Sequence, residues 1–174
     1  LAYIYAGAQK NMGIPGVSIC IGDEQYLNTE NNSKYLNLGQ LVEKNSLLNT
    51  PPTFSIYILK LVTDWMIQMG GVKYFEEKSI RQSSRLYEQL NSYKDFLLLP
   101  VCDYSKSRSN IIFKFENNEL ENKFLMEAGE KGIIGLNGHR SEGGVRISLY
   151  NSITDEMVDY LSEFIDQFFV SNGK

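Results

Sequence analysis

The stretch AYIYAGAQKN, residues 2–11, decides how the first part of the chain folds, because it carries an apolar run directly into a lysine. Residues 2–8 predict a short strand, and the apolar run at 17–21 predicts its partner beyond the glycine-rich turn NMGIPG. Lys10 therefore stands at the mouth of a strand, among glycines. Such a lysine is either an ordinary solvated charge, which is the commoner case, or an amine positioned for chemistry.

Composition and charge narrow the class of protein. The 174 residues fit one ordinary domain or parts of two, and 43% apolar and 22% charged residues are typical of a soluble globular protein. The net charge is −4 with no basic run, which argues against nucleic acid as a partner because phosphate neutralisation needs clustered Lys and Arg. No apolar stretch reaches the length of a membrane span and no signal peptide heads the chain, so we expect a cytoplasmic protein without membrane contact. The chain opens on Leu1 and enters a strand at once, which predicts that upstream sequence precedes it.

The residues that commonly bind metals are few. Cys20 and Cys102 stand far apart without a CxxC spacing, and His139 is the single histidine. We therefore expect no metal site and two buried free thiols in a reducing compartment.

The stretch NTPPTF, residues 49–54, predicts the start of a helix that runs to Met69. Its two prolines set φ for a first helical turn, and Thr53 can cap that turn, although the exposed amides and hydroxyls there also fit an anion. Gly70-Gly71 ends this helix and marks the expected domain boundary. Residues 1–70 are interpreted as the end of a larger domain, and residues 71–174 as a small α+β domain.

The second part of the chain alternates helical and strand patterns. We expect a helix over 72–91 with Val72 buried, a strand over 110–115, a short helix around Phe124 and a half-buried strand at 145–149. A last helix follows Thr154 as N-cap, with Met157 in the core. The polar segment 22–48 shows no period and is predicted to be an irregular excursion over the surface.

The stretch GHRSEGGVR, residues 138–146, concentrates a histidine, two arginines and three glycines within nine positions. The planar guanidinium fork matches a carboxylate or a phosphate, so His139, Arg140 and Arg146 predict a pocket for a ligand with two anionic groups. Arg146 alternates with Val145 and therefore points away from the core side of its strand. The alternative is a solvated turn that carries a few charges.

Taken together, AGAQKN, NTPPTF and GHRSEGGVR, in this order and at these separations, resemble the phosphoserine aminotransferases, a family of fold type I pyridoxal-phosphate enzymes. The resemblance runs the whole length of the chain and includes GGV at 70–72, SRSN at 107–110 and SLYN at 148–151. It implies an α/β fold in which this chain is the C-terminal part, namely the end of the large domain plus the small α+β domain. The turn NMGIPG departs from the family pattern, and the family's N-terminal half is absent from this chain.

The resemblance also implies roles for the residues around Lys10. Lys10 matches the lysine that binds pyridoxal 5'-phosphate covalently and then moves the proton of the reaction. Gln9 matches a residue that helps to hold the cofactor phosphate. Asn49 and Thr50 match residues that reach across a homodimer interface to the cofactor phosphate of the neighbouring subunit.

In the second part of the chain, His139 and Arg140 match groups that bind the substrate phosphate, and Arg146 matches the arginine that binds the α-carboxylate. The implied reaction transfers an amino group between glutamate and 3-phosphohydroxypyruvate, giving phosphoserine and 2-oxoglutarate in serine biosynthesis. The alternatives are an aminotransferase of the same fold with a different substrate, and a non-catalytic fragment that acts as a binding or dimerisation module. Since the family's N-terminal half supplies the rest of the site, we expect the chain alone to be inactive.

Overall fold

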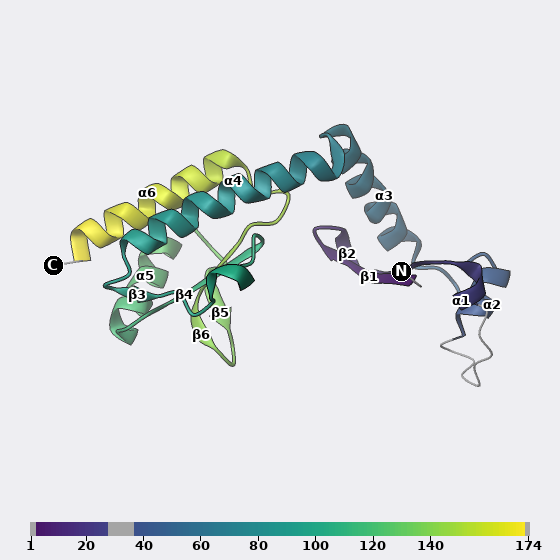
Figure 1. Ribbon diagram of the computed structural model, residues 1–174, viewed down its shortest axis with the longest axis horizontal. Coiled ribbons are helices and arrows are strands. Elements are labelled where there is room, and N and C mark those ends of the chain that lie inside the picture. Colours follow the sequence, from purple (N-terminus) through teal and green to yellow (C-terminus); the bar gives the residue numbers. More distant parts are fainter. Residues whose placement is uncertain (1–2, 28–36, 173–174) are drawn as a thin grey trace. The chain divides into compact units, whose positions relative to one another are not determined.

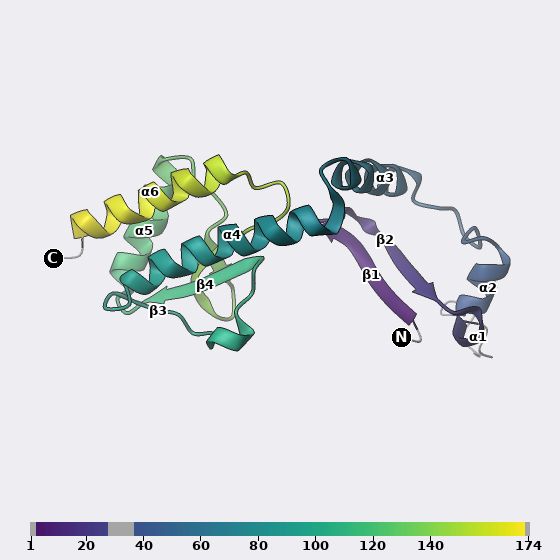
Figure 2. The same ribbon diagram turned by 45° about the horizontal axis from the view of Figure 1, so that its top comes forward.

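The computed structural model describes residues 3–27 and 37–172. The chain divides into two compact units, Leu1–Met69 and Gly70–Lys174, and each is described by itself. Figures 1 and 2 show the elements of both units in two orientations. Among the helices of the described residues, none combines the length and the apolar character needed to cross a membrane.

The first unit is built on an antiparallel hairpin of β1 (Tyr3–Lys10) and β2 (Gly13–Gly22). The register shifts by a bulge between Ala8 and Lys10, just before the tip. Both predicted strands are confirmed. The predicted turn NMGIPG is too long, because β2 already begins at its first glycine and only Asn11-Met12 separates the strands.

Helix α3 (Thr53–Gln68) packs against β2, and two glycines of that strand make the close approach possible. Gly13 and Gly16 both have a φ of 125°, in the region that favours glycine. A Cβ on Gly16 would lie 2.8 Å from Oγ of Ser55, and one on Gly13 would lie 3.3 Å from another side chain of the helix. The Ser55 hydroxyl donates to the carbonyl oxygen of Pro15 at 3.2 Å, so the glycine-rich stretch is fixed to the first turn of α3.

The structure before α3 differs from the prediction in two ways. The segment before α3, predicted to be irregular, contains the short helices α1 (Glu24–Leu27) and α2 (Leu38–Glu43), and Asn37 caps α2 through its Oδ1. Helices this short span too few turns to show a hydrophobic period. Thr53 does not cap α3, because it is the first helical residue and its hydroxyl donates to the carbonyl of Pro51 at 3.3 Å.

The second unit consists of a layer of helices and one antiparallel sheet. The strands follow the spatial order β3–β4–β6–β5, with bounds Leu97–Leu98, Asn110–Phe115, Gly143–Ser148 and Asn137–His139 respectively. The helices are α4 (Gly71–Ser92), α5 (Asn118–Glu130) and α6 (Asp155–Asn172), with a short 3₁₀ turn, η1, at Asp103–Ser105.

Strands β4 and β6 present one buried face to the helices. Ile111 pairs with Ile147, and Phe113 pairs with Val145, and all four side chains are buried. The residues between them, Arg146 among these, are only half-buried on the opposite face. The alternation predicted for the strand at 145–149 is confirmed, and it places Arg146 away from the core.

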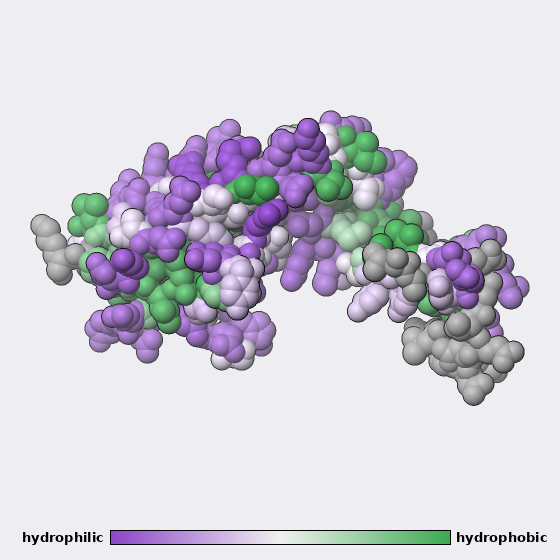
Figure 3. All heavy atoms as spheres, viewed as in Figure 1, coloured by the Kyte–Doolittle hydropathy of each residue, from purple (hydrophilic) through white to green (hydrophobic). Residues whose placement is uncertain are grey.

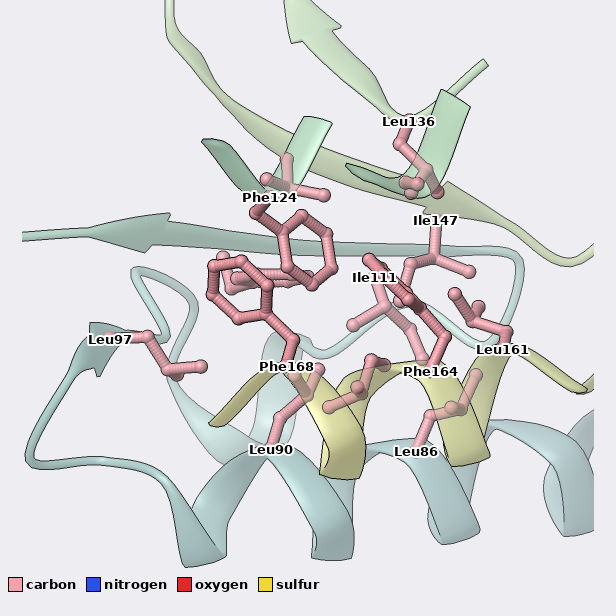
Figure 4. Packing of buried hydrophobic residues seen from close by; sticks show 14 of the residues in the cluster. Leu86, Leu90, Leu97, Ile111, Phe124, Leu136, Ile147, Leu161, Phe164 and Phe168 are labelled. Atoms are coloured by element: carbon pink, nitrogen blue, oxygen red, sulfur yellow. The ribbon is translucent and has the colours of Figure 1, made fainter. Parts of the chain in front are cut away.

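Phenylalanine rings fill the space between the sheet and the helices (Figure 4). Phe124 of α5 is fully buried, and its ring centroid lies 5.8 Å from that of Phe113 and 5.0 Å from those of Phe164 and Phe168. Several of these pairs meet edge to face, the geometry that the ring quadrupole favours. The aromatic cluster therefore fixes α5 and α6 on β4.

Polar side chains join α4 to α6 along their whole contact. Gln82 donates to Oδ1 of Asp155 at 2.8 Å, and near the other end Gln89 and Tyr93 both donate to Oδ1 of Asp166 at 2.7 Å. In each of these bonds the residue on α6 follows its partner on α4 by nearly the same number of residues in the sequence. The two helices therefore run in the same direction. Burial, with the hydrogen bond and charge of Asp166, raises the pKa of Tyr93 to about 12.

Four residues predicted to be buried lie at the surface instead. Val72 and Met157 are 80% and 56% exposed, because each stands in the first turn of its helix, which the core does not cover. The thiols of Cys20 and Cys102 are free and exposed, so the prediction of buried cysteines is wrong. Figure 3 shows that apolar side chains reach the surface elsewhere as well.

Replacement of Phe124 by alanine should lower the free energy of unfolding by about 3–5 kcal/mol, because it leaves a cavity among the aromatic rings. Chemical denaturation of the chain followed by circular dichroism measures this change. Met126→Ala is the matched control on the same helix, since Met126 is 58% exposed and should change stability by much less. Equal destabilisation by the two substitutions would contradict this picture of the core.

Candidate functional site

Lys10 lies at the tip of the β1–β2 hairpin in an unusual backbone conformation. The N–H of Met12 donates to the carbonyl of Gln9 at 3.1 Å and closes a four-residue turn. Within this turn Lys10 has a φ of 54°, the left-handed region that side chains other than glycine rarely adopt. Gln9 and Lys10 are both exposed in this unit. The structure therefore presents the amine at an accessible tip, at a cost in backbone energy that a glycine would avoid.

Asn49 and Thr50 lie in the same unit, in the bend that leads into α3, and both are exposed. The next two residues are Pro51 and Pro52, which have no backbone N–H. An anion at this position would therefore depend on the Asn49 amide and the Thr50 hydroxyl more than on the backbone of the helix start. Among the predicted site residues, the first unit thus holds Gln9, Lys10, Asn49 and Thr50.

The stretch GHRSEGGVR forms the β5–β6 hairpin, where glycines are required by close backbone contacts. A Cβ on Gly138 would lie 1.9 Å from the carbonyl oxygen of Gly143 on the facing strand. Gly143 and Gly144 have φ values of 65° and 75°, so both adopt the left-handed region. The glycines therefore shape a tight hairpin, whereas the sequence indicated only a glycine-rich segment.

His139 ends β5 and is held by Ser141, a residue that the sequence reasoning missed. The Ser141 N–H donates to Nδ1 of His139 at 3.3 Å, and the Ser141 hydroxyl lies 2.9 Å from the same nitrogen. A nitrogen that accepts from a backbone N–H carries no proton, so this arrangement assigns the proton of the neutral ring to Nε2. The exposed His139 ring can therefore donate from Nε2 to an anion. Ser141 could have been identified from its position two residues after the histidine, because at this spacing a side chain can bind a nearby backbone group.

Arg146 carries a buried polar atom without a partner. Its Nε is buried and has no hydrogen-bond partner among the described residues. A buried N–H of this kind costs free energy unless an acceptor is supplied, and a bound carboxylate would supply one. The half-buried face of β6 is thus suited to an anionic ligand.

The three cationic residues share one hairpin. His139 pairs with Gly143 across it, and both His139 and Arg140 are exposed near its tip. Arg146 lies farther along β6, half-buried and on the side away from the core. The hairpin therefore carries all three residues of the predicted pocket for two anionic groups.

The described residues contain no group of three or more His, Cys, Asp and Glu side chains arranged to hold a metal ion. The predicted site residues supply an amine, two amides and a hydroxyl in the first unit, and a histidine and two guanidinium groups in the second. Such a set fits carbonyl chemistry on small anionic compounds.

Comparison with known proteins defines the class. Residues 2–161 match the family model of the class-V aminotransferases, and the chain belongs to this family. A phosphoserine aminotransferase of Shouchella clausii is 40% identical over 167 residues, which cover 95% of this chain and 46% of the relative. A probable phosphoserine aminotransferase of Dictyostelium discoideum is 39% identical over 173 residues, covering 97% and 46%. The chain thus spans about half the length of the curated relatives that it matches.

Solved structures confirm the mixed α/β fold. The phosphoserine aminotransferase of Bacillus circulans subsp. alkalophilus superposes with a TM-score of 0.93 at 34% identity, covering 98% of this chain and 48% of that one. A pyridoxal-phosphate-bound phosphoserine aminotransferase from Trichomonas vaginalis gives a TM-score of 0.86 at 27% identity, covering 95% and 48%. The fold expected from the resemblance is therefore confirmed.

Replacement of Lys10 by glycine should make the chain more stable than replacement by alanine, by about 1 kcal/mol, because glycine adopts a positive φ without a Cβ clash. Thermal or chemical unfolding of the two variants measures the difference. The same pair of substitutions at Lys60, in the middle of α3, is the control, and there glycine should be the less stable by about 1 kcal/mol. The same order of stability at both positions would contradict the left-handed conformation of Lys10.

Proposed function

We propose that the complete protein is a pyridoxal-phosphate-dependent phosphoserine aminotransferase, which transfers an amino group between glutamate and 3-phosphohydroxypyruvate. The observation that carries this proposal is the similarity to phosphoserine aminotransferases over nearly the whole chain. In this proposal residues 1–70 are the end of the large, cofactor-binding domain, and residues 71–174 form the small domain. The reaction belongs to serine biosynthesis, and the absence of a basic run or an apolar span in the sequence supports a cytoplasmic enzyme.

The donor set of the first unit fits pyridoxal 5'-phosphate. Lys10 offers a primary amine, which is the group that reacts with an aldehyde, at the exposed tip of a hairpin. Gln9, Asn49 and Thr50 offer neutral amide and hydroxyl donors, which suit a phosphate. When bound, the cofactor supplies an electron sink, while the protein supplies binding and orientation. Lys10 would then accept and return the proton at the α-carbon of the substrate.

The second unit supplies groups for the two anionic ends of the substrate. Arg146 would bind the α-carboxylate, since its buried Nε–H has no hydrogen-bond partner among residues 3–27 and 37–172. His139, with its proton at Nε2, and Arg140 would bind the phosphate of phosphoserine or the distal carboxylate of glutamate. One cationic tip can serve both substrates because each ends in an anion.

We propose that the complete protein is a homodimer, in which Asn49 and Thr50 reach the cofactor phosphate of the neighbouring subunit. Both residues are exposed in the bend before α3, so they are accessible to a second copy.

The Lys10→Ala variant of the complete protein should lose the covalent attachment of pyridoxal phosphate, and turnover should fall by about 10²- to 10⁴-fold, because the amine that holds the cofactor and moves the proton is gone. Borohydride trapping followed by peptide mass analysis locates the attachment in the unmodified protein. Lys44→Ala, which removes an exposed lysine beyond α2, is the control and should keep both properties. Full turnover of the Lys10→Ala variant with bound cofactor would refute the role of Lys10.

The Arg146→Ala variant should raise the KM for both phosphoserine and glutamate by about 10- to 100-fold, since a charged hydrogen-bonded contact to the carboxylate is lost. Arg146→Lys should recover only part of this loss, because an ammonium lacks the planar fork. Steady-state kinetics with each substrate measures both effects. Arg108→Ala is the control, since Arg108 is exposed and forms a 3.6 Å ion pair with Glu76. Kinetics unchanged from the wild type would count against a carboxylate contact.

A further inference from the structure

Glu121 has no assigned role in the proposed reaction, yet its carboxylate connects α5 to both central strands. Its Oε1 accepts from the N–H of Gly144 at 3.2 Å, and its Oε2 accepts a longer bond from the N–H of Phe115 at 3.4 Å. Both acceptor oxygens of one half-buried side chain are therefore used by backbone groups of β6 and β4. Bonds from backbone N–H groups to a carboxylate are stronger than neutral ones.

These two N–H groups lie just beyond the end of the β4–β6 ladder. The last pair of that ladder is Phe113 with Val145. Gly144 cannot extend it, because its φ of 75° turns the backbone out of the extended conformation. A buried N–H without a partner is costly, so the carboxylate of Glu121 takes the place of the missing pair.

The atoms around Gly144 also leave no room for a side chain. A Cβ at this position would lie 2.8 Å from the carbonyl oxygen of Phe113 and 2.9 Å from Cγ of Lys114. Lys114 in turn forms an ion pair at 4.0 Å with Glu142, on the far side of Gly143. Glu121, from α5, and Lys114, from β4, thus both hold residues 142–144 next to the hairpin tip.

The position of Gly144 determines that of His139. Gly143, the neighbour of Gly144, pairs directly with His139 across the hairpin. The carbonyl of His139 accepts from the N–H of Glu142 at 3.0 Å, which closes the tip that carries Arg140. A displacement of Gly144 would therefore move the two residues proposed to bind the phosphate. Arg146, by contrast, is held by its pairing with Ile112 and by its N–H bond to the carbonyl of Leu136 at 2.7 Å.

We propose that Glu121 is a positioning residue for recognition of the distal anion, through the chain of contacts Glu121–Gly144–Gly143–His139. This inference rests on the proposed function, because it takes His139 and Arg140 as the phosphate-binding pair. Glu121 touches neither substrate nor cofactor. It fixes the position of the hairpin tip, which carries the proposed phosphate-binding residues. The proposed contact of Arg146 with the carboxylate does not depend on Glu121.

The test is the Glu121→Gln variant of the complete protein. A glutamine amide offers one acceptor oxygen in place of two, so one backbone N–H loses its partner while the shape of the side chain is kept. The KM for phosphoserine should rise about 3- to 10-fold, as expected for one lost hydrogen bond, with kcat within about twofold of the wild type. Inhibition by propionate, a monocarboxylate that probes the Arg146 contact alone, should not change.

Glu119→Gln is the matched control, since Glu119 is an exposed acid in the same first turn of α5 and has the same effect on the helix dipole. It should leave all three parameters unchanged. Glu121→Asp provides a second variant if Glu121→Gln does not give folded protein. It keeps the charge but is one methylene too short to reach both N–H groups, and it should also raise the KM for phosphoserine.

The outcomes separate this inference from the proposed function. If the wild type turns over phosphoserine and the Glu121 variants match Glu119→Gln, the positioning role is wrong and the proposed function stands. A parallel loss of kcat, phosphoserine affinity and propionate affinity would show a general structural role and would also overturn it. If the wild type does not turn over phosphoserine, the proposed function itself fails, and the inference fails with it.

Discussion

The left-handed backbone at the tips of two hairpins is the constraint on which both groups of candidate site residues depend. In β1–β2 a single non-glycine residue, Lys10, adopts this conformation, whereas in β5–β6 two consecutive glycines do so. The difference is informative, because the left-handed conformation costs glycine little energy and costs lysine more. At Gly143 and Gly144 the chain needs only the backbone path. At Lys10 a residue with a side chain adopts the same region at a conformational cost, which agrees with the role proposed for its amine.

A conformation of this kind persists only where the surroundings hold it, and each unit does so differently. In the first unit, Gly13 and Gly16 let α3 approach β2 closely, and Ser55 bonds the strand two residues beyond Gly13. In the second unit the support comes from the aromatic cluster. Phe115 is a member of that cluster, and its N–H is also bonded to Glu121, so the same strand end serves the core and the hairpin tip. The aromatic core and the hairpin that carries the cationic residues are therefore joined at one strand end.

The sequence predicted the elements with strong periods and missed those without them. Val145 and Ile147 alternate with Arg146 over a long enough run to identify both the strand and its buried face. Strand β5 is too short and too rich in glycine to show a period, and α1 and α2 are too short as well. For the candidate site, the residue types were readable from three motifs. The pairing of His139 with Gly143 was not, because the three-residue strand β5 shows no pattern that fixes its register.

The proposed recognition of two different substrates by one cationic tip would depend on the position of the backbone more than on the number of charges. A flexible arginine or histidine loses conformational freedom when it binds, and this loss is smaller if the backbone and ring are fixed beforehand. The His139 ring is fixed locally by Ser141, and the strand pair beneath it is fixed by Glu121. Arg146 needs no such device, since a strand on either side holds it within the sheet. The exposed tip therefore requires more positioning contacts than the strand interior, and the structure provides them from α5, an element that carries none of the proposed binding residues.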